Sequence, residues 1–324
     1  MPQQQLMLNV RARLKVYRFF ITLLDANMTA KISTFDRKHL PFVAELMNEE
    51  YEGSPEFIPF DEERFLSETQ RRHVRVLVAE DDGHVVGVIG THTDDRGEDI
   101  HWLAARKAPE GNVVRDMLVN EAERNAKGDS IMRMIDEGSP EIEEWESRGY
   151  VLEPGFQRMT AELRDPTRVP EVDEGIRLRT LRPGEEAEFV ETVNAGFGWE
   201  RLEVGDLERW KTEDPPFDEE WVQVAEAAGK IVSVVVAKPD TDYNKYLHCR
   251  MGYLGPAATL SEFRNKHLAS ALTARAMNLL FEKGMNTVRL GTSEKNVSSI
   301  ALLRSLGFHV ENVRKILRKK LKDN

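Results

Sequence analysis

The sequence predicts an α/β protein made of two tandem domains of similar fold. Near the C-terminus, a loop and a helix follow an apolar strand pattern, and a second strand and helix come after them. A similar order of landmarks occurs in the first half of the chain, and a segment without periodicity lies between the two. A length of 324 residues suits two domains of ordinary size.

An internal repeat supports the two domains. Residues 78–89 and 224–235 share six of twelve amino acids at a spacing of 146, and both read as strand, glycine turn, strand. Farther along, residues 148–150 parallel residues 306–308, where an Arg-Gly-Tyr triplet corresponds to Leu-Gly-Phe. Because the landmarks recur in the same order, a duplication explains them better than chance does.

The domain boundaries follow from this repeat and from one linker. Residues 164–175 contain two prolines and alternating charges without periodicity, which is typical of a linker. We therefore expect an N-terminal extension at 1–29, a first domain at 30–165, a linker at 166–175 and a second domain at 176–324. The apolar run within the extension is too short to span a bilayer.

The most informative stretch of the second domain is a loop that leads into an apolar helix. The strand expected before it, residues 246–259, contains Gly255 and Pro256, which suit a kink or bulge. Arg264 and Lys266 then add positive charge at the start of the helix. Since the first N–H groups of a helix lack intrahelical partners, this loop is expected to attract phosphate oxygens.

The residues after the loop complete a recognisable order. Apolar residues at three- and four-residue spacings predict a helix that ends near Gly284; they are Leu268, Ala271, Leu272, Ala276, Leu279 and Leu280. A strand at 286–292 follows, then Asn296 and a helix that ends before Gly307 and Phe308. Strand, R-x-x-G-x-A-like loop, helix, strand, Asn and helix together resemble the GNAT superfamily of acyl-CoA-dependent N-acyltransferases.

The resemblance implies a fold, a co-substrate and a reaction. Each domain should hold a mixed, mostly antiparallel central sheet flanked by helices. The co-substrate should be acetyl-CoA, without a metal, and its acetyl group should pass to a primary amine of a small molecule or protein by direct attack in a ternary complex.

The resemblance also implies which residues bind acetyl-CoA. Main-chain amides of the loop should bind the coenzyme A pyrophosphate, and Asn296 should contact the acyl-CoA arm. A main-chain N–H near the bulge should hold the thioester carbonyl. The loop residues are Arg264, Asn265, Lys266, His267, Leu268 and Ala269, and the carbonyl donors are sought among Ala257, Ala258, Thr259 and Leu260.

Two positions depart from the family pattern. His267 stands where the loop usually has a glycine, so its Cβ and imidazole need room beside the pyrophosphate. Leu303 stands where many members carry a tyrosine that protonates the departing thiolate. A GNAT-like protein that binds acyl-CoA without catalysis, with a binding or regulatory role, is therefore the alternative to an active enzyme.

The residues that move protons are sought on and near the strand before the loop. Alternation along that strand places Cys249 and Tyr253 on one face and His248 on the other. We expect Tyr253 to replace the missing acid, and His248 or Glu294 to act as a base through water. Cys249 as a nucleophile is the lesser alternative, because no histidine partner is indicated.

The first domain carries an altered version of the same loop. At residues 108–113, Pro109 removes an amide donor and Glu110 adds a carboxylate that would repel pyrophosphate. Gly138 stands where the second domain has Asn296. We therefore expect the first domain not to bind acyl-CoA, but to wall the substrate pocket or complete the fold.

Composition argues against several classes of function. A net charge of −11 argues against general nucleic-acid binding, which requires a basic face. The single cysteine, Cys249, suits a reducing cytoplasm, and the histidines within 73–101 show no metal-ligand spacing. Carboxylates within 197–221 are candidates to receive a cationic amine. We expect a cytoplasmic monomer or homodimer that binds acetyl-CoA and an amine acceptor, and no nucleic acid, membrane or metal.

Overall fold

The chain folds into two compact units. The computed structural model describes residues 30–54, 57–71, 73–94, 97–107, 111–213 and 216–321. One unit extends from the N-terminal part of the chain to Glu153 and resumes at Ile316; the other comprises Pro154–Lys315. The expected extension at 1–29 and the altered loop at 108–110 lie outside the described residues. Among the described helices, none combines the length and the apolarity that crossing a membrane would require.

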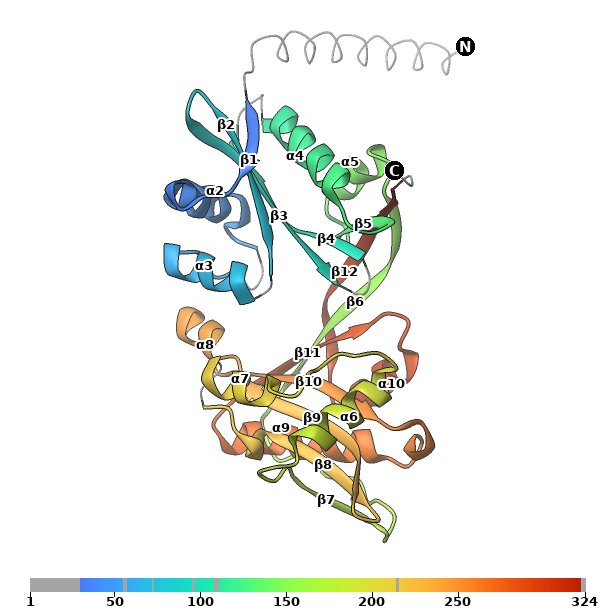
Figure 1. Cartoon of the computed structure of the whole chain (residues 1–324). Helices are drawn as coiled ribbons and strands as arrows, with labels where there is room; N and C mark the ends of the chain where they lie inside the picture. Colours follow the sequence, from blue (N-terminus) through green and yellow to red (C-terminus); the bar gives the residue numbers. More distant parts are fainter. Residues whose placement is uncertain are drawn as a thin grey trace, which may run out of the picture. The chain divides into compact units, whose positions relative to one another are not determined.

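The first unit contains a sheet with helices packed against it (Figure 1). Its elements are β1 (Lys31–Thr34), η1 (Arg37–His39), α2 (Leu40–Tyr51), α3 (Glu62–Arg71), β2 (Arg75–Asp81), β3 (His84–Asp94), β4 (Gly97–Ala105), α4 (Gly111–Asn125), β5 (Ser130–Asp136), α5 (Glu141–Ser147) and the start of β6 (Val151–Glu162). Strands β1 to β5 are neighbours in sequence order. They pair antiparallel except for β4 and β5, which are parallel.

The second unit repeats this plan. Its elements are β7 (Ile176–Thr180), α6 (Glu186–Phe197), α7 (Asp206–Glu213), η2 (Glu219–Trp221), β8 (Val222–Ala227), β9 (Lys230–Pro239), α8 (Thr241–Leu247), β10 (Met251–Thr259), η3 (Ser261–Phe263), α9 (Leu268–Glu282), β11 (Thr287–Ser293), α10 (Val297–Ser305) and β12 (His309–Lys320). Strands β7 to β11 are again neighbours in sequence order, and only β10 and β11 among them pair parallel. The prediction of two similar mixed, mostly antiparallel sheets is confirmed.

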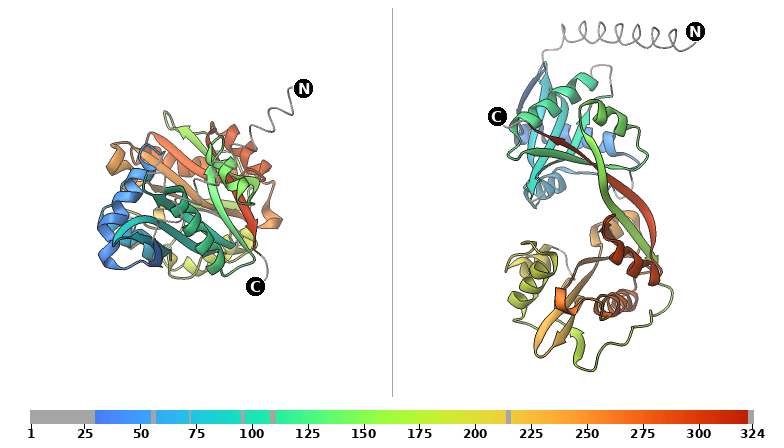
Figure 2. Two further views of the ribbon diagram at one scale, coloured as in Figure 1. Left: turned by 90° about the horizontal axis from the view of Figure 1, so that it is seen from above. Right: turned by 90° about the vertical axis from the view of Figure 1, so that its right-hand side faces the viewer.

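Strands β6 and β12 each run from one unit into the other. β6 starts in the first unit, and its residues 156–162 pair antiparallel with β11 of the second. β12 starts in the second unit, and from Ile316 it belongs to the first, where Leu317 is fully buried in the core. The two strands are neighbours in the sheet (Figure 2). The boundary expected at residue 165 was drawn from the sequence repeat. The compact units differ from it, because each includes part of a strand from the other half of the sequence.

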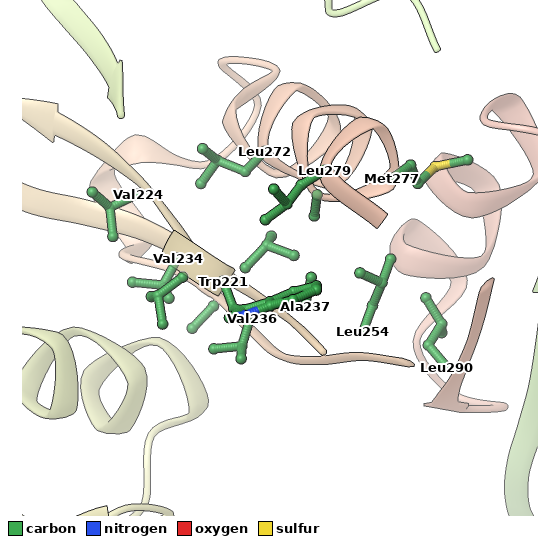
Figure 3. Packing of buried hydrophobic residues seen from close by; sticks show 14 of the residues in the cluster. Trp221, Val224, Val234, Val236, Ala237, Leu254, Leu272, Met277, Leu279 and Leu290 are labelled. Atoms are coloured by element: carbon green, nitrogen blue, oxygen red, sulfur yellow. The ribbon is translucent and has the colours of Figure 1, made fainter. Parts of the chain in front are cut away.

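The core of the second unit lies between α9 and the sheet. Figure 3 shows Leu272 and Leu279 of α9 facing Val234 and Val236 of β9. All six apolar residues of the predicted helical stripe are buried, and the helix stops before Gly284, which has φ +88°. Burial of each large side chain stabilises the fold by about 1.5–3 kcal/mol. This packing fixes the loop that precedes α9.

Helix α8 occupies part of the segment expected to be a strand. The predicted strand started at residue 246, but β10 starts at Met251, so the prediction was wrong for residues 246–250. Asn244 explains the difference: its side chain donates to the Met251 carbonyl and accepts from the Met251 N–H, each at 2.7 Å. These bonds hold a turn between α8 and β10 that periodicity does not reveal.

Leu317→Ala should destabilise the first unit by about 2–5 kcal/mol, because it leaves a cavity in that unit's core. Hydrogen exchange should become faster in β5 and stay unchanged in β11. Val310→Ala lies in the half of β12 that belongs to the second unit and is the matched control, with its effect expected in β11. Equal changes in both strands for Leu317→Ala would contradict this assignment of β12.

Candidate active site

A β-bulge in β10 opens the sheet beside β11. The pairing of β10 with β9 changes register between Leu254 and Ala257, and Gly255 adopts φ +145°, which favours glycine. The bond between Gly255 and Pro256 is cis. Parallel pairing with β11 covers three residue pairs and ends at Tyr253. The predicted bulge is confirmed, and within the described part of the chain the side of β10 that faces β11 has no strand partner beyond Tyr253.

Main-chain amides beyond the bulge point alternately to the two sides of β10. Leu260 donates its N–H to a β9 carbonyl at 3.0 Å. This N–H, one of those expected to bind the thioester carbonyl, is therefore already paired within the sheet. Because successive strand amides alternate, Ala258 also faces β9, whereas Ala257 and Thr259 face the open side. The Thr259 nitrogen is covered by the end of α6, since a Cβ on Gly196 would lie 3.2 Å from it. Ala257 is therefore the best-placed donor in the opening.

Tyr253 borders this opening. A Cβ on Gly255 would lie 3.3 Å from the Tyr253 ring, so the missing side chain makes room for the phenol. Burial raises the pKa of Tyr253, against smaller opposing effects of Arg201 and of the Gly291 N–H in β11. The hydroxyl therefore keeps its proton at neutral pH and can donate it to a group bound in the opening.

The loop before α9 presents a run of unpaired amides. The Arg264 N–H bonds the Ser261 carbonyl at 3.3 Å, and the Ala271 N–H bonds the His267 carbonyl at 2.9 Å. Between them, the amides of residues 265–270 have no main-chain or side-chain acceptor in the described part of the chain. They point outward at the positive end of the α9 dipole and suit an anion such as phosphate.

Two residues of this loop adopt the left-handed conformation. Asn265 has φ +63°, and His267 has φ +59° at the N-cap of α9. A Cβ in this conformation costs roughly 1–2 kcal/mol, which would favour the glycine that the resemblance implied at the position of His267. Asn and His are among the residues that tolerate it best. The loop therefore adopts a backbone that suits glycine with other residues at these two positions.

The side chain of Arg264 bridges two main-chain segments. Its Nη2 donates to the Gly196 carbonyl at 3.0 Å, and its Nε donates to the Thr259 carbonyl at 3.4 Å. The guanidinium thereby meets the negative end of the α6 dipole. In this structure Arg264 ties the end of α6 to the loop.

Asn296 and Leu303 hold α10 in place. Asn296 is exposed and caps α10, because its Oδ1 accepts the Ser299 N–H at 3.1 Å. Leu303 is 3% exposed and packs in the core of the second unit. The position at which the resemblance implied a catalytic tyrosine is therefore a packing position here.

His248 and Cys249 do not occupy the strand faces that alternation predicted. Both precede β10, and His248 is the exposed C-cap of α8 with φ +52°. The Cys249 thiol donates to the Asn244 side chain at 3.2 Å, and burial together with Asp240 raises its pKa. A thiol that stays protonated is a poor nucleophile, which argues against the covalent alternative.

Glu294 is held by two partners at the end of β11. One oxygen pairs with Lys315 Nζ at 2.7 Å, and the other accepts the Gly155 N–H at 2.6 Å. Burial alone would raise the pKa of Glu294, but these two donors outweigh it and hold the pKa below its usual range. The carboxylate acts as a structural tie among β11, β6 and β12.

The loop between α6 and α7 contributes residues that the sequence did not single out. Arg201 lies 4.4 Å from the centre of the Phe197 ring and acts electrostatically on Tyr253. Asn194 fixes this loop by accepting the N–H groups of Arg201 and Leu202 at 2.8 and 3.0 Å. The clustered aromatic and basic residues of this segment were the available signal.

Four of the carboxylates within residues 197–221, a segment expected to receive a cationic amine, form ion pairs within the protein. The ion pairs are Asp206 with Arg209, Glu208 and Glu219 with Lys211, and Glu220 with Lys283. These four charges are already balanced, which does not favour a cation site at these four residues.

Comparisons with known proteins find similarity in the second half of the chain. The model of the acetyltransferase (GNAT) family matches residues 183–308. A mycothiol acetyltransferase of Thermobispora bispora is 32% identical over 163 residues, 47% of this chain and 52% of the relative. The chain thus spans about half the length of the curated relatives that it matches.

Solved structures show the same fold over nearly the whole chain. A GCN5-related N-acetyltransferase from Sphaerobacter thermophilus has a TM-score of 0.67 at 18% identity, with 91% of this chain and 96% of that chain covered. A tandem GNAT protein from the clavulanic acid biosynthesis pathway has a TM-score of 0.66 at 15% identity, with 91% and 100% covered. These likenesses establish the tandem fold.

Glu294→Gln should lower the free energy of unfolding by roughly 1–3 kcal/mol at neutral pH, because the half-buried Lys315 ammonium loses its ion pair with this carboxylate. The pKa of Glu294 is lowered by folding, so its contribution is present above the unfolded pKa near 4.3 and disappears as the pH falls through the folded value. Urea unfolding of both proteins from pH 7 downward measures this. Glu143→Gln, on an exposed position of α5, should change little; a Glu294 effect that persisted undiminished in acid would contradict the ion pair.

Proposed function

We propose that the chain is an N-acetyltransferase that transfers an acetyl group from acetyl-CoA to a primary amine of a small molecule or protein. The observation that carries the proposal is the opening between β10 and β11: the Ala257 N–H lies on the unpaired stretch of β10, and the ring of Tyr253, the last residue paired with β11, lies beside Gly255. The family domain at residues 183–308 supports acyl transfer. The name of the relatives, mycothiol acetyltransferase, supports acetyl as the group transferred.

Acetyl-CoA binding is assigned to the second unit. Amides of residues 265–270 would bind the pyrophosphate, and Lys266 would add charge at the same place. Asn296 is exposed at the start of α10 and would contact the acyl-CoA arm. Arg264 would act mainly by joining the loop to α6. No metal is needed for this binding.

The proposed reaction is a direct attack in a ternary complex. The Ala257 N–H would polarise the thioester carbonyl and stabilise the oxyanion that forms there. The amine attacks in its neutral form, the new C–N bond forms, and the C–S bond then breaks. Tyr253 gives its proton to the departing thiolate, and the resulting tyrosinate takes up the proton that the acetylated nitrogen loses. In this scheme Glu294 and His248 hold structure and take no part in the proton transfers.

Binding and turnover can be tested separately. Acetyl-CoA should raise the melting temperature of the protein, and thiol release with a panel of amines should show turnover. A protein that bound acetyl-CoA but acetylated no amine would support the alternative of a catalytically inactive binding or regulatory protein. Absence of any acetyl-CoA binding would exclude both.

Tyr253→Phe should lower kcat roughly a hundredfold, because the thiolate loses its acid. Since the pKa of Tyr253 is raised above the ordinary value near 10, the wild-type rate should fall only in strongly alkaline solution, where the phenol loses its proton. The variant should lack this alkaline fall. Tyr246→Phe, an exposed tyrosine of α8, is the control and should behave as wild type. Equal kcat for wild type and Tyr253→Phe would rule out the acid role.

A further inference from the structure

The two units can be compared position by position at their bulges. Leu103 in β4 pairs with Ile89, and Ala257 in β10 pairs with Val235. Ile89 and Val235 are 146 residues apart, which is the spacing of the sequence repeat. Both β4 and β10 change register just before these residues. Leu103 is therefore the counterpart of Ala257.

The first unit has the same opening beside this residue. The parallel pairing of β4 with β5 covers two residue pairs and ends at Asp99. The pairing of β4 with β3 continues to Ala105. Leu103 therefore lies on the stretch of β4 that has separated from β5, as Ala257 lies on the stretch of β10 that has separated from β11.

In the first unit, the Leu103 N–H is bonded to a side chain of the protein itself. The Leu103 N–H donates to the Tyr51 hydroxyl at 3.1 Å, and the hydroxyl lies 3.4 Å from the Leu103 carbonyl, to which it can donate. Tyr51 is the last residue of α2. Its oxygen thus stands where the thioester carbonyl oxygen would stand in the second unit.

Arg133 fills the space next to this hydroxyl. Its guanidinium donates to the Ile100 carbonyl at 3.4 Å and lies 5.4 Å from the centre of the Trp145 ring. It also interacts with the Tyr51 hydroxyl, and the residue is 6% exposed. A buried cation with these neighbours leaves the opening closed to a thioester.

The counterpart of Tyr51 in the second unit is Phe197. Helices α2 and α6 both contain 12 residues and end at Tyr51 and Phe197, again 146 residues apart. Phe197 has no hydroxyl to offer to Ala257. The centre of its ring instead lies 4.4 Å from the Arg201 guanidinium, which also acts electrostatically on Tyr253.

We propose that Tyr51 is an internal substitute for the acyl thioester that closes the first unit, and that Phe197 keeps the matching amide of the second unit open. Phe197 is then a positioning residue, and the chain binds one acetyl-CoA. The part that concerns Phe197 rests on the proposed function, whereas the part that concerns Tyr51 does not.

The test is to add the missing hydroxyl. Phe197→Tyr should lower kcat roughly tenfold, about 1.4 kcal/mol, because the carbonyl must displace the hydrogen bond of the added hydroxyl. The Kd for acetyl-CoA should change less than kcat, since the loop amides are untouched. Phe197→Leu removes the ring without adding a hydroxyl and should lose less activity. Full activity of Phe197→Tyr, or an equal loss in both variants, would overturn the role of Phe197.

Hydrogen exchange of individual amides, measured by NMR, tests whether Tyr51 closes the first unit, and it does not depend on turnover. Tyr51→Phe should leave kcat unchanged and speed exchange at Leu103. Acetyl-CoA added to the wild type should bind at one equivalent and protect Ala257 but not Leu103. Protection of Leu103 by acetyl-CoA, a second equivalent bound, or unchanged exchange in Tyr51→Phe would overturn the closure. If the wild type bound no acetyl-CoA, the proposed function would fail, while the Leu103 exchange would still decide the Tyr51 contact.

Discussion

The candidate site depends on one constraint: β10 cannot stay paired with β9 and β11 along its whole length. The bulge at Gly255 and Pro256 lets β10 follow β9 to Thr259 after its pairing with β11 has ended. An unpaired strand amide in a protein interior is costly, so the opening must be filled. In the second unit the proposed occupant is a substrate; in the first it is a tyrosine.

Local signals predicted the parts of this arrangement that depend on nearby residues. Gly255 and Pro256 marked the bulge, and the apolar stripe marked α9, because both are set by steric and packing rules within a few residues. The turn before β10 was missed because it depends on the side chain of Asn244, which offers the backbone an alternative to a strand. Arg201 was missed because only the folded chain brings it near Tyr253. The crossing of β6 and β12 between the two units gives no local signal, because the residue pattern of a strand does not show which unit's sheet it joins.

The comparison of the two units shows how little chemistry separates an open site from a closed one. Tyr51 and Phe197 differ by one oxygen and occupy corresponding helix ends. The sequence repeat is clearest in the hairpins, which are constrained by packing, and weakest near the openings. Glu294, in turn, shows that a carboxylate close to a site in sequence can be fully committed to holding strands together.

The placement of Leu317 has a consequence for biosynthesis. During translation the first unit emerges from the ribosome long before β12 is made, yet its sheet includes the segment that starts at Ile316. Its core therefore stays open at one edge until the segment that starts at Ile316 has been added. A fragment that stopped before this segment would lack one strand of the first unit's sheet.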